Sequence, residues 1–200
     1  DNLPPLSSPL YVRPILKYNG RSYRPMETIP TDVLPLDLIH RSVKRMFDGD
    51  GEDSPTAPTV KVINMSIGDP NIQFTGKMSP FARLIDWLSA KYNVLFIISA
   101  GNHSKPITLE IPAVEFRGLS TVEQQQKAFE SVHRDTRNRK LLSPAESINA
   151  ITVGAIHNDS SSLILRGGKL DLYGEGMPSV YSAHGNGYNR SVKPDIAFTG

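Results

Sequence analysis

Short apolar runs alternate along this chain with segments in which apolar positions recur every third or fourth residue. A run without polar alternation, such as Val94–Ile98, is typical of a strand that is covered on both faces. The strands predicted on this basis are Leu10–Leu16, Val60–Met65, Val94–Ile98, Ala150–Ala155 and a last strand from Lys193 onward. Pro14 must lie near the end of its strand or at an unpaired position, because it has no N–H for a ladder.

Helical signals fill the intervals between these strands. The predicted helices are Pro35–Phe47, a segment from the N-cap pair Ser79-Pro80 to Asn93, and a polar segment from the capping box Ser120-Thr-Val-Glu123 toward Arg134. We also expect a turn or short helix start at Ser143-Pro-Ala145, and a short hairpin of Leu163–Leu165 with Leu170–Tyr173. Strands that alternate with helices predict an α/β fold with a mainly parallel sheet flanked by helices.

The end of the run at residues 94–98 is the most informative local feature. The strand is followed by Ser99-Ala-Gly-Asn102, so that small residues and one side-chain amide come directly after its carboxyl end. In open α/β sheets, ligands gather at the carboxyl ends of strands. The amide of Asn102 could donate a hydrogen bond to an oxyanion there. From this segment alone an ordinary turn is the alternative, because Gly and Asn are common turn residues.

Composition excludes several classes of site. The net charge is +2, and the densest basic segment, residues 134–140, holds four basic residues and one Asp. That is too little for a nucleic-acid footprint, so we expect no nucleic-acid partner. The sequence has no Cys, which excludes disulfides and thiolate metal sites. No apolar stretch reaches membrane-spanning length and no signal peptide is visible, so no membrane partner is expected, and the compartment stays open.

Four groups of residues gain significance from their order along the chain. They are Asn64-Met-Ser-Ile-Gly68; Ser99-Ala-Gly-Asn102; Ser143-Pro-Ala145 with Ala150-Ile-Thr-Val-Gly-Ala155; and Tyr181-Ser-Ala-His-Gly185 running to Lys193-Pro-Asp-Ile196. In this order they resemble the subtilisin-like serine proteases (subtilases), with their Asn-Met-Ser-Leu-Gly, Ala-Ala-Gly-Asn and Lys-Pro-Asp-Ile/Val-x-Ala-Pro-Gly segments. Residues 10–16 are similar to the strand after the family's catalytic-His helix, so the resemblance covers nearly the whole chain.

The resemblance implies a subtilisin-like three-layer fold that is incomplete here. Subtilases carry their triad in the order Asp, His, Ser. Asp and His lie upstream of the strand matched by residues 10–16, and Ser follows the segment that ends here at Gly200. The chain is therefore expected to be an internal fragment without any triad residue, inactive alone. We expect one partial peptidase domain over residues 1–200, with a linker-like start at 1–9 and a family-atypical insertion at 103–142.

The resemblance also assigns roles within the site. Asn102 matches the oxyanion-hole Asn of the family. Ser66, Ile67 and Gly68 match the backbone edge that pairs with an extended substrate, where Gly permits close approach. Ser99, Ala100 and Gly101 match the floor of the pocket for the side chain before the scissile bond, with room for a large apolar or aromatic group. The alternative for both stretches is tight helix–strand packing.

Other chemistry-bearing residues are assigned structural roles. The five histidines, which are His40, His103, His133, His157 and His184, lack the surroundings of a catalytic subtilase His. Ser54, Ser99 and Ser161 lie in no nucleophile motif. No cofactor is expected. A Ca²⁺ site in the acidic loop Asp48–Asp53 is left open, although this loop lacks the sixth-position Gly and distal Glu of an EF-hand. Asn102-His-Ser104 fits a glycosylation sequon, but a glycan there would block the site.

The residues and the resemblance are consistent with two functions. The first is a fragment of a serine endopeptidase that acts on peptides or proteins. The alternative is a subtilase-fold pseudoenzyme, or a peptide-binding or regulatory module, with a degenerate triad. Phe198-Thr-Gly200 stands where the family has Ala-Pro-Gly, which puts the approach to the nucleophile in doubt. Missing upstream strands would leave unpaired edges, so we expect residues 1–16 to be displaced, disordered or paired with another copy, and the fragment to form a homo-oligomer.

Overall fold

The computed structural model describes residues 10–19, 26–158 and 174–199, and the hairpin predicted within residues 163–173 lies outside them. The chain divides into two compact units, residues 1–61 and 62–200, which are described separately. No helix in the described ranges has the length and apolar character needed to cross a bilayer.

The described residues of the first unit form a small hairpin and one helix. Strand β1 (Lys17–Asn19) pairs antiparallel with β2 (Met26–Thr28), and α1 spans Pro35–Phe47 as predicted. The apolar face of α1 is buried at Ile39, Val43 and Met46.

The prediction of a strand at residues 10–16 is wrong. These residues form no regular strand, and pairing starts only at Lys17. Pro14 can donate no ladder hydrogen bond. Leu10 and Val12 are 75% and 68% exposed, so these side chains are not buried as those of a core strand would be.

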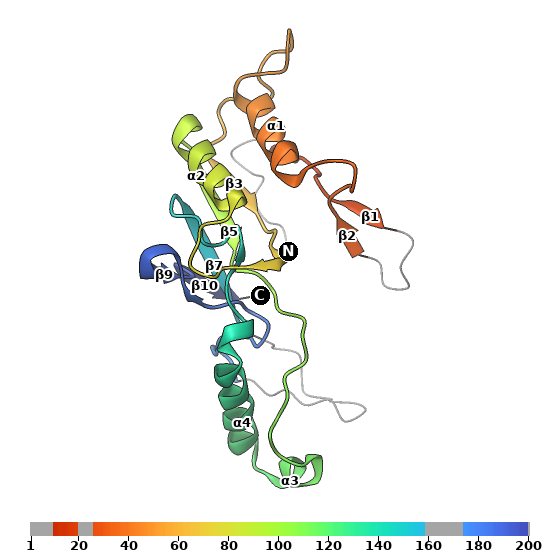
Figure 1. The fold of residues 1–200 in the computed structure, drawn as a ribbon, viewed down its shortest axis with the longest axis vertical. Helices are drawn as coiled ribbons and strands as arrows, with labels where there is room; N and C mark the ends of the chain where they lie inside the picture. The colour runs from red at the N-terminus through yellow and green to blue at the C-terminus, as the bar shows by residue number, and fades with distance from the viewer. Residues whose placement is uncertain (1–9, 20–25, 159–173, 200) are drawn as a thin grey trace, which may run out of the picture. The chain divides into compact units, whose positions relative to one another are not determined.

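The second unit is built on a parallel four-stranded sheet (Figure 1). Its strands are β3 (Val62–Met65), β5 (Leu95–Ser99), β7 (Ala150–Ile156) and β10 (Ile196–Thr199), in the spatial order β10-β7-β5-β3. Three of these strands confirm the predicted apolar runs within a few residues. The last predicted strand is divided, because β9 (Val192–Lys193) pairs antiparallel with β8 (Gly185–Asn186) before β10 begins.

Helix α2 (Pro80–Tyr92) packs against β5 and β7. As predicted, Ser79 is its N-cap and accepts a hydrogen bond from the backbone N–H of Ala82 at 3.1 Å, and the helix ends at Asn93. Asn93 adopts the left-handed conformation. The core between helix and sheet includes side chains that are fully shielded from solvent, among them Ile85, Leu88, Phe96 and Ile98. The fold is therefore α/β, with a parallel sheet and flanking helices.

Residues 103–142, which we call the excursion, leave the four-stranded sheet after β5 and end at β6 (Leu142–Ser143), which belongs to a separate two-stranded sheet (Figure 1). The excursion contains α3 (Ala113–Gly118), α4 (Thr121–Arg134) and the 3₁₀ turn η1 (Thr136–Asn138). The predicted capping box of α4 is present, with Ser120 and Glu123 each bonding the other's backbone. Strand β6 pairs with β4 (Asp69–Gln73), and neither this pairing nor α3 was predicted.

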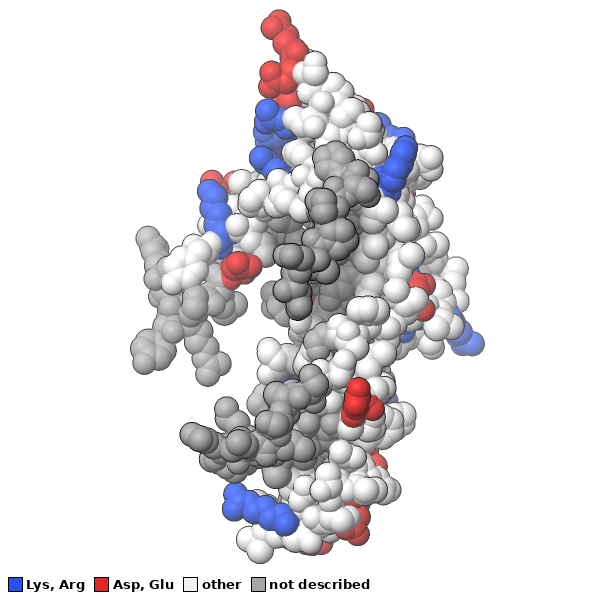
Figure 2. Space-filling view, turned by 180° about the vertical axis from the view of Figure 1, so that it is seen from behind, with Lys and Arg blue, Asp and Glu red and all other residues white. Residues whose placement is uncertain are grey.

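Charged side chains of both signs are interspersed over the described surface that Figure 2 shows. Several belong to local ion pairs, such as Arg41 with Asp37 and Lys127 with Glu130. Exposed pairs of this kind contribute little to stability.

Candidate active site

The segments that follow β3 and β5 converge on Leu142. A Cβ atom added to Gly68 would lie 3.2 Å from the Leu142 Cβ and 3.4 Å from the Gly101 Cα. A Cβ atom on Gly101 would lie 2.5 Å from the Leu142 Cγ. The fold therefore brings the two glycines of the predicted site into contact, and the excursion supplies the leucine that packs on both.

Residues 66–68 follow β3, which ends at Met65, and lead toward β4. Ser66 is exposed and its Oγ lies 3.4 Å from the Asn64 Oδ1, while Ile67 and Gly68 are half-buried. The Ile67 backbone N–H bonds back to the Met65 carbonyl at 2.9 Å. The chain then turns into β4.

Residues 99–101 are held on several sides. The Ser99 Oγ accepts the backbone N–H of Gly101 at 3.1 Å. The Ala100 N–H donates to the Val153 carbonyl at 2.8 Å, and its carbonyl accepts the Leu142 N–H at 3.0 Å. Ala100 is 1% exposed and packs in a small apolar cluster with Phe74, Leu141, Ala145 and Ala183. Its methyl group is therefore part of the core beneath the site.

Asn102 lies in a short antiparallel pairing with the segment around Ser182. On one side the Gly101 carbonyl accepts the Ala183 N–H at 2.8 Å, and on the other the His103 N–H donates to the Tyr181 carbonyl at 2.8 Å. The backbone of Asn102 is thus fixed from both sides. Its side chain is exposed, and in the described part of the chain it has no hydrogen-bond partner.

The segment opposite Asn102 is itself attached to β7. The Ser182 Oγ accepts the Ala155 N–H at 3.0 Å, and the Ser179 N–H donates to the Ala155 carbonyl at 2.9 Å. Gly154 lies beside both this segment and Pro194, since a Cβ there would lie 3.4 Å from the Ser182 Oγ and 2.7 Å from the Pro194 Cγ. The position of Asn102 therefore depends on β5 and β7 together.

His103 is buried directly after Asn102. Its Nε2 lies 2.8 Å from the Lys140 carbonyl, to which it donates. Burial lowers the pKa of His103 below the ordinary value of 6.5, and the charges of Arg139, His184 and Lys105 act in the same direction against the bond to Lys140. His103 thus joins the first residues of the excursion to its last ones.

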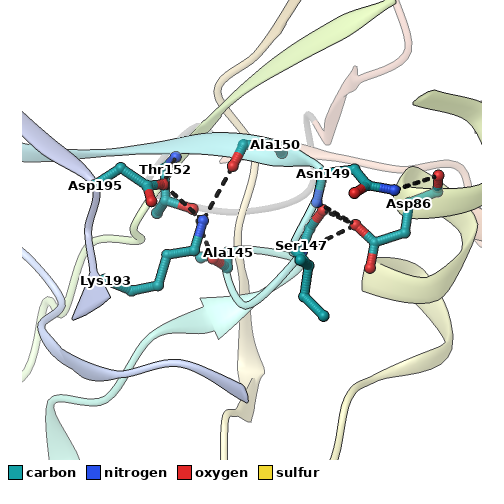
Figure 3. Close-up of polar contacts among 9 residues, drawn as sticks. Asp86, Ala145, Ser147, Asn149, Ala150, Thr152, Lys193 and Asp195 are labelled. Carbon is teal, nitrogen blue, oxygen red and sulfur yellow. Dashed lines mark hydrogen bonds and ion pairs between the residues drawn. The ribbon is translucent and has the colours of Figure 1, made fainter. Parts of the chain in front are cut away.

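Two carboxylates brace the amino-terminal side of β7 (Figure 3). The Asp195 Oδ2 accepts the Thr152 N–H at 2.7 Å and pairs with the Lys193 Nζ at 2.6 Å. The Asp86 Oδ1 accepts the Ser147 hydroxyl and the backbone N–H groups of Ile148 and Asn149 at 2.6, 2.9 and 2.8 Å. No local signal in the sequence indicates the role of Asp86, because its partners lie about sixty positions away.

A sequence model of the subtilase family matches residues 38–200. The chain belongs to the subtilase family. The match begins after residues 10–16, the segment whose predicted strand is absent. A similar curated protein is the uncharacterized protein y4bN of Sinorhizobium fredii, which is 30% identical over 150 residues. The alignment covers 70% of this chain and 31% of that protein, so the chain spans about a third of the length of its relative.

Membership of this family of serine peptidases confirms the resemblance read from the ordered motifs and the α/β fold that it implied. The roles of Asn102, residues 66–68 and residues 99–101 remain predictions. No cluster of three or more His, Asp or Glu side chains suited to a metal ion occurs within the described ranges, the acidic loop at residues 48–53 included.

Proposed function

We propose that this chain supplies the oxyanion-binding and substrate-binding half of a serine endopeptidase site. Peptides or proteins are the substrates, and the Asp, His and Ser of the triad lie outside these residues. The observation that carries the proposal is the exposed Asn102 amide, fixed at the carboxyl end of β5 by backbone bonds on both sides. The contact of Gly68 with Gly101 supports a shared binding surface.

In the proposed reaction the nucleophilic Ser attacks the scissile carbonyl while His takes its proton. Negative charge then develops on the carbonyl oxygen, and the Asn102 Nδ2–H donates to it. A donor whose backbone is already fixed need not reorganise when that charge appears. The substrate backbone would lie along residues 66–68 as an added strand, with the preceding side chain over residues 99–101.

The test is Asn102→Ala in the full-length protein. In a subtilisin, loss of one oxyanion donor costs about 2.7–4 kcal/mol of transition-state stabilisation, and we adopt that magnitude here. We expect kcat to fall about 100- to 1000-fold with little change in KM, because the donor acts mainly on the transition state. Steady-state hydrolysis of a peptide p-nitroanilide measures both.

Asn158→Ala, at another exposed Asn, is the matched control and should leave kcat unchanged. An Asn102→Ala enzyme with the parental kcat would exclude the oxyanion role. Peptide binding by a full-length protein that hydrolyses nothing would instead favour the peptide-binding module.

A further inference from the structure

Arg139, near the end of the excursion, is the largest fully buried side chain in the described part of the chain, with 1% of its surface exposed. A buried guanidinium is costly unless its charge is paired and its N–H groups are bonded. The partners of the guanidinium must therefore compensate for its burial.

The guanidinium contacts three separate segments. Its Nη1 donates to the Val180 carbonyl at 2.8 Å and its Nη2 to the Lys105 carbonyl at 3.2 Å. Its Nε lies 3.3 Å from the Asp135 Oδ2, an ion pair whose geometry falls short of a hydrogen bond. The backbone carbonyl of Arg139 also accepts the His184 N–H at 3.0 Å.

These contacts lie on either side of the backbone pairing that fixes Asn102. Lys105 lies three residues after Asn102, on one side of that pairing. On the other side, Val180 directly precedes Tyr181, whose carbonyl accepts the His103 N–H. The pairing itself is one bridge with a hydrogen bond on each side. At its far end, beyond Ala183, the Arg139 carbonyl holds His184. The same residue thus ties both ends of the segment opposite Asn102 to the excursion.

We propose that Arg139 is a positioning residue for the Asn102 amide, so that the excursion completes the scaffold of the oxyanion site. This inference rests on the proposed function, because it assumes that Asn102 is the oxyanion donor. Arg139 touches no reacting atom in it.

Arginine suits this position better than lysine. Its planar fork presents donors in fixed directions, so one side chain reaches two carbonyls and a carboxylate at once. An ammonium group on a flexible stem can keep the charge but cannot reproduce the two directed bonds. Arg139→Lys therefore removes the geometry while it preserves the charge beside Asp135.

The test is a double-mutant cycle in the full-length enzyme, made of Arg139→Lys, Asn102→Ala and both together. Enzyme concentration is set by end-point titration with a phosphonofluoridate, so that kcat refers to folded active sites. We expect Arg139→Lys to lower kcat about 10- to 100-fold with KM nearly unchanged, since a displacement of about 1 Å can cost about 100-fold. In the Asn102→Ala background the same change should alter kcat less than about twofold, because the donor it positions is already gone.

A purely structural Arg139 would lower the titrated fraction and the melting temperature, and its effect on kcat would be equal in both backgrounds. Equal effects would overturn the inference and leave the proposed function intact. A parental kcat in Asn102→Ala alone would remove the proposed function, and this inference with it. Arg137→Met, an exposed arginine of the same excursion, is the matched control and should leave kcat unchanged.

Amide hydrogen exchange gives a readout that needs no activity. In Arg139→Lys the N–H groups of His103 and Ala183 should exchange faster, while those within α2 keep the parental rate. Should Arg139→Lys fail to fold, Arg139→Gln replaces it, because its amide keeps an N–H donor but not the fork that reaches both carbonyls. Unchanged exchange at His103 and Ala183 would overturn the inference.

Discussion

Gly101 is the single residue between Ala100 in the core and Asn102, the candidate oxyanion donor. Its φ of 110° is a conformation that side chains with a Cβ rarely adopt, and Leu142 occupies the space that a Cβ would need. Ala100 is held inside the core, whereas Asn102 is exposed directly after this bend. The positive φ therefore permits the change from buried strand to exposed amide within two residues.

The lowered pKa of His103 predicts a pH-dependent stability. In the unfolded chain the imidazole takes up a proton near pH 6.5, whereas in the folded chain it does so only at lower pH. Between these two pKa values the unfolded state binds more protons, so the free energy of unfolding falls as the pH drops below about 6.5. Above that pH the imidazole is neutral in both states and contributes no pH dependence.

The parent should therefore lose melting temperature between pH 7.5 and pH 5.5, and His103→Gln should lose less. Gln is chosen because its amide can still donate to the Lys140 carbonyl. Thermal unfolding of the full-length protein at a series of pH values measures this difference. His133→Gln, at an exposed position of α4, should keep the parental slope. The same slope in His103→Gln and the parent would contradict the prediction.

At the scale of the elements, interactions between residues close in sequence can be predicted, whereas contacts between distant segments cannot. Helix α1 and the capping box of α4 were predicted correctly, because side-chain spacing and caps act within a few residues. The β4–β6 pairing joins segments about seventy residues apart, and Asp69 and Ser143 carry no sign of each other. Asn102 and the residues before it can be proposed from contiguous motifs, whereas nothing in the sequence distinguishes Arg139 from the other basic residues of the excursion.

Asp86 links helix α2 to the start of β7, and its loss should weaken that connection. Asp86→Ala removes the acceptor for one hydroxyl and two backbone N–H groups. Ile148 and Asn149 are exposed, so water can replace part of what they lose. We expect the free energy of unfolding to fall by about 2 kcal/mol, which corresponds to a melting temperature lower by about 4–8 °C.

Asp86→Asn keeps one acceptor oxygen and should lose less than Asp86→Ala. The control is Asp37→Ala, which removes an exposed pair with Arg41 at 3.5 Å and the first-turn carboxylate of α1, and should cost less than about 1 kcal/mol. Thermal unfolding of the four proteins, the parent included, gives the order. Equal melting temperatures for Asp86→Ala and Asp37→Ala would show that α2 is held to β7 by apolar packing alone.

At the scale of the whole molecule, the two outer strands of the sheet formed by the described residues carry exposed apolar side chains. Strands β3 and β10 each have one neighbour in the four-stranded sheet of the described residues. Val62 on β3 is 51% exposed, and Ile196 and Phe198 on β10 are 54% and 69% exposed. Open edges with apolar side chains are templates for pairing with another chain.

The 200-residue chain on its own should therefore self-associate through these edges, and light scattering should show a mass that rises with concentration. A lysine on an edge strand opposes such pairing, so Val62→Lys and Phe198→Lys together should shift the chain toward monomer. Val114→Lys, at an 86% exposed residue of α3 away from the sheet edges, should leave the association unchanged. Because the substitutions alter the edges and leave the core in place, circular dichroism should be the same for all three proteins. A parent chain that stays monomeric at every concentration would mean that the edges are protected within the chain itself.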